Sequence, residues 1–264
     1  MKKIIVAMFA LVMVANQALA FNEYGHKSAM ILTNKYLTEK AKNEIKSALG
    51  GSTMVKEAVW LNTLRKSEAT AYTKNWHFFR LDENGKSTTN DENDGVVVVE
   101  RSIEVLRNRA KHTPAEVKDA LRTVIHLVVD MHTLSHIRID GIHETNGFDF
   151  FHWNEGEGKA SREWKAKWYT LWNNAYFGRY RVFPLDYHAE DIDIHCHEKR
   201  AEYEKGTPRF WAENVGEDVV RAVKDFPMGQ SVPTNIIQRY EEVHVKCMAK
   251  ASYRLAALLN DIFK

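Results

Sequence analysis

The most constraining feature of this sequence is an apolar helical segment that carries two ionisable side chains. Thr113-Pro114-Ala115-Glu116 has the pattern of a capping box with proline at the first helical position, so we predict a helix from here to about Ser135. His126 and Asp130 lie four residues apart in it and therefore share one face. Because Leu127, Val128 and Val129 separate them, we expect the helix to be largely buried.

A buried carboxylate is costly in free energy, so Asp130 needs a partner. One solution is a divalent metal ion shared with histidines, and the other is a His–Asp hydrogen bond inside a helical core. His136 follows Asp130 by six residues, near the predicted helix end. His77 stands in an aromatic setting, where its polar ring also needs a partner.

The rest of the chain also predicts helices. Only 13 Gly and 5 Pro among 264 residues leave little room for a turn-rich all-β fold. Thr38 is a candidate N-cap for a helix over 39–49 that Gly50-Gly51 would close. Val96–Val99 has strand propensity, but the period of the following residues favours a helix from about Gly95, after a polar loop over 82–95. A long amphipathic helix is expected over 237–262, and the fold class is all-α, as a single domain.

The first 20 residues have the pattern of a signal peptide, with Lys2 and Lys3, an apolar stretch over 4–15 and a small-x-small site at Ala18-Leu19-Ala20. We therefore expect residues 21–264 to form the exported domain, in the periplasm or outside the cell. The new α-amino group, with a pKa near 8, can lose its proton at modest cost. Together with the Phe21 carbonyl and the His26 imidazole, it could chelate one metal ion.

The net charge and hydropathy of the chain limit which classes of binding partner it can have. Without Lys2 and Lys3, the 37 Lys and Arg residues fall to the same number as the 35 Asp and Glu residues. A neutral chain argues against a broad electrostatic grip on nucleic acid, although not against a local cationic metal site. No apolar run long enough for a membrane span follows Phe21. Cys196 and Cys247 could form a disulfide after export or remain buried free thiols.

Several motifs, in order and spacing, resemble the S1/P1 nuclease family of secreted zinc-dependent phosphodiesterases, related in fold to zinc phospholipase C. The clearest is His126-x3-Asp130-x-His132-x3-His136. The others are Gly25-His26, Ala58-Val59-Trp60-Leu61-Asn62, Asn75-Trp76-His77-Phe78, Trp211-Ala212-Glu213 and the segment 251–260. The resemblance covers the mature chain.

The resemblance implies a helical phospholipase C/P1 nuclease-like domain with zinc at the bottom of a cleft. It implies that Phe21, His26 and Asp130 hold one zinc ion, that His77, His126 and Asp130 hold a second, and that His136 contributes to a third. The substrates it implies are single-stranded nucleic acid and 3′-nucleotides, attacked by an activated water.

The chain departs from the family pattern at three positions of this site. Asn62 stands where the family has its water-activating aspartate, and a neutral amide cannot accept the proton of that water. The third zinc also needs a histidine and an aspartate downstream, where the best match offers Tyr169 and Asn173. A competing register over Ser161–Lys165 lacks the pair as well. We expect one or two zinc ions rather than three.

Two functions from different classes follow. The first is a secreted hydrolase with an incomplete zinc cluster and weakened activity. The second is an inactive family member that binds metal or nucleotide as a binding module. The family's turn is altered here to Asn146-Gly147-Phe148. His143 and His152 lie beside it in the sequence and could compensate for the lost metal ligands. A second polar cluster comprises His188, Asp191, Asp193, His195 and His197. On an extended segment, Asp191, Asp193, His195 and His197 would share one side. The favoured alternative is a solvated surface loop.

Overall fold

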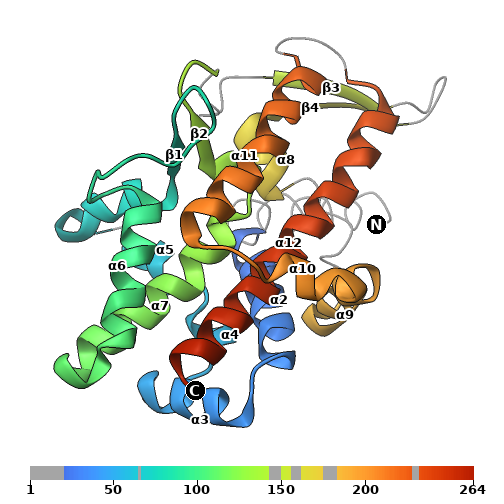
Figure 1. Ribbon diagram of the computed structural model, residues 1–264. Coiled ribbons are helices and arrows are strands. Elements are labelled where there is room, and N and C mark those ends of the chain that lie inside the picture. Colours follow the sequence, from blue (N-terminus) through green and yellow to red (C-terminus); the bar gives the residue numbers. More distant parts are fainter. Residues whose placement is uncertain (1–20, 65–66, 143–149, 156–161, 175–182, 228–231) are drawn as a thin grey trace, which may run out of the picture.

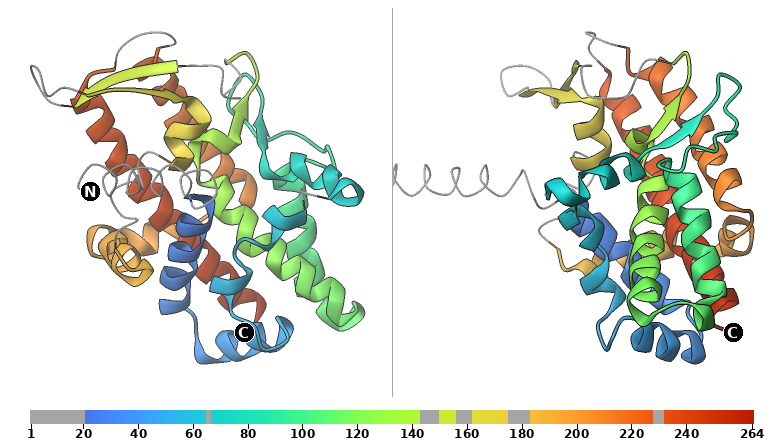
Figure 2. Two further views of the ribbon diagram at one scale, coloured as in Figure 1. Left: turned by 180° about the vertical axis from the view of Figure 1, so that it is seen from behind. Right: turned by 90° about the vertical axis from the view of Figure 1, so that its left-hand side faces the viewer.

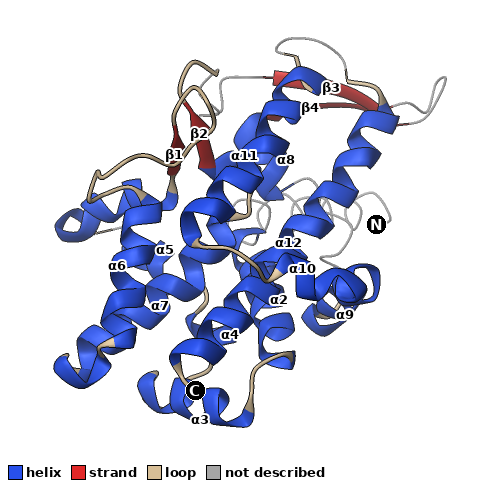
Figure 3. Ribbon diagram, viewed as in Figure 1, coloured by secondary structure: helices blue, strands red, loops and turns tan. Residues whose placement is uncertain are grey.

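The computed structural model describes residues 21–64, 67–142, 150–155, 162–174, 183–227 and 232–264. Helices predominate in it, which confirms the predicted all-α class (Figure 3). The α-helices are α2 (Phe21–Lys35), α3 (Glu39–Ala48), α4 (Met54–Glu57), α5 (Trp60–Leu64), α6 (Gly95–Arg107), α7 (Pro114–Met131), α8 (Trp168–Asn174), α9 (Leu185–Cys196), α10 (Arg200–Tyr203), α11 (Pro208–Asp225) and α12 (Thr234–Ile262). The 3₁₀ helices are η1 (Glu68–His77), η2 (Arg109–Lys111), η3 (Leu134–His136) and η7 (His197–Lys199).

Helix α7 is the buried centre of the fold. Its predicted capping box is present, with the Thr113 side chain accepting from the Glu116 backbone and the Glu116 carboxylate accepting from the Thr113 backbone at 2.7 Å. Residues 123–131 are all buried. Helices α6, α12, α11 and α2 pack around α7, and Figure 2 shows α6 running alongside it. This environment accounts for the apolar residues between His126 and Asp130.

Helix α7 ends at Met131, earlier than the predicted end near Ser135. The side chains of His132 and Thr133 bond back to the carbonyls of Val128 and Val129 at 2.7 and 3.2 Å, and Thr133 is extended. Such side-chain bonds compete with a regular helix. On a continuous helix, His136 would point about 120° away from Asp130. The break into η3 instead turns His136 back toward that carboxylate.

The other predicted helix starts are confirmed. Thr38 caps α3 by accepting from the Ala41 backbone, and Gly50 and Gly51 follow the helix with φ of 65° and 84°. Asp94 caps α6 by accepting from the Val96 backbone, so residues 96–99 are helical rather than a strand. The segment over 82–94 is a largely exposed loop, as expected.

The long C-terminal helix is also confirmed. Helix α12 packs against α2, α9 and α7, and Figure 1 shows it crossing the front of the molecule. Its apolar stripe enters the core through Tyr240, Met248, Leu255 and Leu259, all 3% exposed or less.

Two small sheets complete the described structure. Strands β1 (Phe79–Leu81) and β2 (Ile137–Ile139) are parallel, with Arg80 opposite Arg138. Each strand closely follows a 3₁₀ helix that ends in a histidine: β1 begins two residues after His77 of η1, and β2 begins directly after His136 of η3. This ribbon therefore lies at the same end of the molecule as both histidines. Strands β3 (Phe150–Glu155) and β4 (Arg162–Lys167) are antiparallel.

The prediction of an extended segment or surface loop over residues 188–197 is wrong. These residues form α9 and the start of η7, and His188 and Asp193 are buried. Asp193 accepts from the hydroxyls of Tyr36 and Tyr253 at 2.8 and 2.6 Å. A helical period therefore sorts this cluster into an inner and an outer face, and the inner face ties α9 to α2 and α12.

The structure favours the second of the two alternatives for the cysteines. Cys196 and Cys247 are both buried and both free thiols in it. Burial raises the pKa of the Cys247 thiol to about 12, so it stays protonated at neutral pH.

Candidate metal centre

One carboxylate, that of Asp130, is the meeting point of four imidazoles from three parts of the chain. The nearest nitrogen atoms lie 2.7 Å (His77 Nδ1) and 3.1 Å (His126 Nε2) from Oδ2. On the other oxygen, His26 Nε2 lies 3.3 Å and His136 Nε2 3.6 Å from Oδ1. All five residues are at most 3% exposed. The helix break after Met131 and the burial of α7 together create this cluster.

Backbone carbonyls fix the protonation of two of these rings. His126 Nδ1 lies 2.7 Å from the Ala58 carbonyl oxygen, and His136 Nδ1 lies 2.6 Å from that of His77. A carbonyl only accepts, so each Nδ1 must carry the proton. In the neutral rings, each Nε2 then presents a lone pair to the Asp130 carboxylate. Two acceptors that face each other in a dry core repel unless a cation lies between them, and metal-bound histidines are held in this same way.

The atoms on the Oδ2 side have the spacing of ligands around one small ion. His126 Nε2 and His77 Nδ1 lie 3.3 Å apart, and each is within 3.1 Å of Asp130 Oδ2. Tetrahedral zinc with bonds of 2.0–2.1 Å places its ligand atoms about 3.3 Å apart. This triangle is therefore near the size that a single zinc ion requires.

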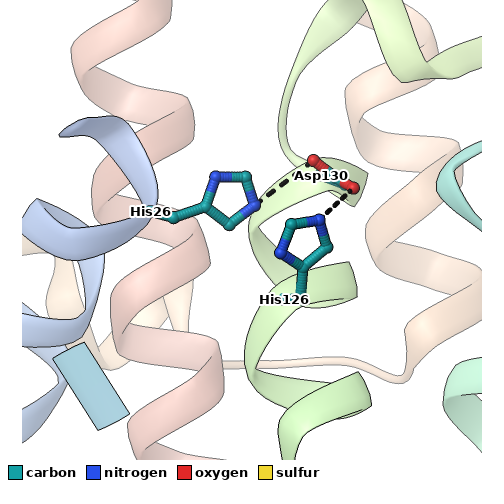
Figure 4. A group of neighbouring side chains, drawn as sticks. All are labelled: His26, His126 and Asp130. Atoms are coloured by element: carbon teal, nitrogen blue, oxygen red, sulfur yellow. Dashed lines mark ion pairs between the residues drawn. The ribbon is translucent and has the colours of Figure 1, made fainter. Parts of the chain in front are cut away.

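His26 brings α2 to the same carboxylate. Its ring stacks on that of His126 with centroids 4.1 Å apart (Figure 4). Ligand atoms of His26, His126 and Asp130 all lie within 4.8 Å of one another. Helix α2 begins at Phe21, five residues before His26, so its N-terminal part lies on the side of the centre that His26 reaches. The Phe21 side chain is not described.

The Asp130 carboxylate is ionised, and two of the rings around it, those of His126 and His136, are neutral. Burial raises the pKa of Asp130, but the nearby His136 and His126 imidazoles outweigh this effect and hold it well below the usual value. Burial lowers the pKa of His126 to about 3 against the opposing pull of Asp130, and it lowers the pKa of His136 as well. An ionised carboxylate beside the neutral imidazoles of His126 and His136 in a dry core is a donor set that a divalent cation completes.

A second layer of hydrogen bonds holds the end of α7. No role for its residues was expected from the sequence. Arg254 of α12 donates to His132 Nε2 at 2.7 Å and to the Tyr203 carbonyl at 2.9 Å. Burial, with the Arg254 charge, keeps the pKa of His132 well below its usual value, so this ring is neutral. Both residues stand inside the quoted motifs, but only tertiary structure joins them across 122 positions.

Asn62 lies on α5, in the segment whose Ala58 carbonyl accepts from His126. Its side chain is half-buried, and Oδ1 is buried without a hydrogen-bond partner among the described residues. A buried carbonyl oxygen without a hydrogen-bond partner can bind a metal ion weakly or accept a hydrogen bond from a water molecule. The amide still cannot act as a base.

The preferred downstream register places both of its residues beside η3. The Tyr169 ring lies 5.8 Å from that of His136, and the buried Asn173 accepts from the Ser135 hydroxyl at 3.0 Å. Ser161 of the competing register lies outside the described residues. Where the resemblance calls for a histidine and an aspartate, the groups beside His136 are thus a phenol and an amide.

The remaining candidates divide between distant and undescribed positions. His195 and His197 lie on the exposed side of α9 and η7, and His188 packs against Tyr24. His143 lies outside the described residues, as does the altered turn, and nothing is described of the side chain of His152 in β3. The structure does not bring the described ones to Asp130.

A comparison with protein-family models matches residues 21–264 to the S1/P1 nuclease model. The chain belongs to the S1/P1 nuclease family. The resemblance is thereby confirmed, and with it the helical phospholipase C/P1-like fold. A search of curated proteins finds no match.

Membership in the S1/P1 nuclease family connects the chain to nuclease-type phosphodiester hydrolysis, to nucleic acid as substrate and to zinc. Members of the family are typically secreted. Within the described residues, none of the helices has the length and apolar character needed to cross a bilayer.

Proposed function

We propose that this S1/P1 nuclease family member binds one or two zinc ions around Asp130 and hydrolyses phosphodiester bonds slowly. Its substrates would be single-stranded nucleic acid or 3′-nucleotides. The observation that carries this proposal is the buried, ionised Asp130 carboxylate facing imidazole nitrogens whose protons are committed to backbone carbonyls.

In this proposal the residues have separate roles. His77, His126 and Asp130 hold one zinc ion, and His26 and Asp130 hold another with the main-chain atoms of Phe21. His136 would contribute to the third zinc position, which we expect to be incomplete. When bound, zinc supplies a Lewis acid for the phosphoryl oxygens and makes a water more acidic. The Ala58 and His77 carbonyls keep two rings in the tautomer that exposes Nε2 inward.

Slow chemistry follows from Asn62, Tyr169 and Asn173. An amide at 62 removes the general base, which typically costs about 10²–10⁴-fold in rate. A phenol and an amide beside His136 do not offer the anionic or imidazole ligands that zinc prefers. These same substitutions favour the second candidate, an inactive family member that binds metal or nucleotide without turnover.

Export belongs to the same proposal. Residues 1–20 would be a signal peptide whose removal frees the amine of Phe21, and the product would reside in the periplasm or outside the cell. The mature protein is then residues 21–264, the range that the family model matches.

The test uses residues 21–264 loaded with zinc, with single-stranded DNA and a 3′-nucleotide as substrates. We expect slow hydrolysis that a chelator abolishes and that Asp130→Asn lacks. Bound zinc without any turnover would support the binding module instead. A wild-type protein that holds no zinc would reject both candidates as metal proteins.

A further inference from the structure

A buried arginine lies next to the end of α7. Arg254 of α12 is 2% exposed, and no carboxylate of the described residues lies within ion-pair distance of it. Burial lowers the pKa of Arg254 to about 10, so the side chain is still charged at neutral pH. A buried charge is costly in free energy unless it is well hydrogen-bonded. The groups that Arg254 bonds therefore show what this charge holds in place.

Three acceptors from three other helices surround the guanidinium. Nη1 donates to His132 Nε2 at 2.7 Å, Nε to the Tyr203 carbonyl at 2.9 Å and Nη2 to Asn214 Oδ1 at 3.1 Å. His132 is the C-cap residue of α7, Tyr203 lies on α10 and Asn214 on α11. All three guanidinium nitrogens are thereby used, and Arg254 fixes the end of α7 relative to α10, α11 and α12.

The His132 ring transmits this restraint to the backbone of α7. A guanidinium can only donate, so Nε2 of the ring accepts and carries no proton. Nδ1 carries the proton and donates to the Val128 carbonyl at 2.7 Å. Because both ring nitrogens are used, the ring cannot turn without breaking a buried hydrogen bond. The last turn of α7, which contains Asp130, is held in this way.

His132 and the carboxylate of the metal centre lie on opposite sides of this turn. Residues two apart on a helix point about 200° apart, so Asp130 and His132 face different neighbours. The Thr133 backbone then donates to the Asp130 carbonyl at 2.9 Å, and η3 brings His136 Nε2 to 3.6 Å from Asp130 Oδ1. Arg254 therefore holds the end of α7 on one side, while the carboxylate and the following histidine meet on the other.

We propose that Arg254 is a positioning residue for the metal centre, which acts through His132 to set where Asp130 and His136 lie around the bound ion. This proposal rests on the proposed function only for the presence of that ion. Arg254 is not a ligand and takes no part in bond cleavage. Hydrogen-bonded groups that orient metal ligands from behind typically contribute about 10- to 100-fold to metal affinity.

The test compares metal binding by residues 21–264 of wild type and variants. Zinc affinity is measured by competition with a chelator, and the visible absorption of bound cobalt(II) reports the geometry of the ligands. For Arg254→Ala we expect zinc affinity to fall by about 10- to 100-fold and the cobalt(II) spectrum to change. His132→Gln should bind zinc better than His132→Leu, because an amide offers an acceptor to Arg254 and a donor to the Val128 carbonyl.

A double-mutant cycle tests whether Arg254 acts through His132. If it does, Arg254→Ala and His132→Leu together should lower zinc affinity by no more than the larger of the two single losses. Single losses that multiply in the double variant would overturn the proposed route through His132.

Arg209→Ala is the matched control. Arg209 of α11 also donates to several groups, the Glu100 carboxylate and the Ser87 and Thr89 carbonyls, but none of them belongs to α7. Its loss should lower the stability and leave zinc affinity and the cobalt(II) spectrum as in wild type. If Arg254→Ala does not fold, Arg254→Lys takes its place with the same expected direction, because one ammonium group cannot reach acceptors on three helices.

Hydrolysis of a 3′-nucleotide, measured in parallel, separates this proposal from the proposed function. Unchanged zinc affinity and an unchanged cobalt(II) spectrum in Arg254→Ala overturn the positioning role even if wild type hydrolyses the substrate. A loss of affinity in Arg254→Ala, with a wild type that binds zinc and does not hydrolyse, supports the positioning role and rejects the proposed hydrolase. A wild-type protein that binds neither metal overturns both.

Discussion

Asp130 Oδ2 and His126 Nε2 face each other 3.1 Å apart, and each presents a lone pair to the other. The His126 proton is committed to the Ala58 carbonyl on the opposite side of the ring. A hydrogen bond between the two residues would need an imidazolium, and burial opposes that state by lowering the pKa of His126 to about 3. A cation between the two atoms removes the conflict, which makes this pair the best argument for a metal.

The first prediction concerns Asp130→Asn. Zinc should raise the melting temperature of wild type and leave that of the variant unchanged. At a zinc concentration of 100 times the dissociation constant, the stabilisation of wild type would be about 2.7 kcal/mol. Measurements in a chelator give the zinc-free melting temperature of each protein as its own baseline. Thermal unfolding with zinc and with chelator measures both effects, and equal stabilisation of the two proteins by zinc would refute the shared carboxylate.

The second prediction concerns Asn62→Asp. A carboxylate there would restore a base and a strong ligand, so zinc affinity should rise, and hydrolysis of a 3′-nucleotide should rise by about 10²-fold or more. Thr63→Asp is the matched control, because Thr63 is the exposed neighbour on α5 and the charge change is the same. If the two variants behave alike, Asn62 does not belong to the centre.

Much of this arrangement could be predicted from the sequence because its signals are local. The capping box of Thr113 and Glu116 predicts the start of α7, and the apolar residues around His126 predict that this helix is buried. The need of Asp130 for a partner follows from that burial alone. The resemblance to the S1/P1 nuclease family then implies which histidines gather, and the structure brings His26, His77, His126 and His136 to the carboxylate.

The errors have tertiary causes. The end of α7 depends on hydrogen bonds from the His132 and Thr133 side chains to the backbone, which neither capping motifs nor hydrophobic periodicity can predict. Asp193 looks like surface charge until Tyr36 and Tyr253 are found around it. The contact of Arg138 with Phe78 joins β2 to the residue before β1, 60 positions earlier in the chain, so no spacing along the sequence reveals it.

The third prediction concerns Arg254→Ala. The buried guanidinium donates to His132, Tyr203 and Asn214, and its removal leaves these acceptors without their charged donor. We expect a loss of at least about 3 kcal/mol in the free energy of unfolding, from hydrogen bonds to a charged group. Arg107→Ala breaks only the exposed ion pair of Arg107 with Asp261, so it should cost less than about 1 kcal/mol. Urea unfolding in chelator compares them, and equal losses would show that Arg254 does not hold the end of α7.

The fourth prediction concerns the acid dependence of stability through Asp193. Burial raises the pKa of this carboxyl, but hydrogen bonds from Lys35, Tyr253 and Tyr36 outweigh it and leave the pKa below the usual value. The stabilisation is therefore present above the unfolded value of about 3.9 and is lost as the pH falls through the lower folded value.

Asp193→Asn should accordingly cost roughly 1–3 kcal/mol at pH 7, where the charged acceptor is lost. The difference from wild type should shrink below about pH 4. Urea unfolding in chelator from pH 7 to pH 3 measures it. A difference that stays constant across this range would assign the cost to packing and not to charge.

The most direct test of a zinc centre at Asp130 is anomalous diffraction at the zinc edge from zinc-loaded crystals of residues 21–264. We predict one or two peaks that share the Asp130 carboxylate, with His77 and His126 around one of them, and none between Tyr169 and Asn173. No peak at Asp130, or three peaks including one beside Asn173, would contradict it.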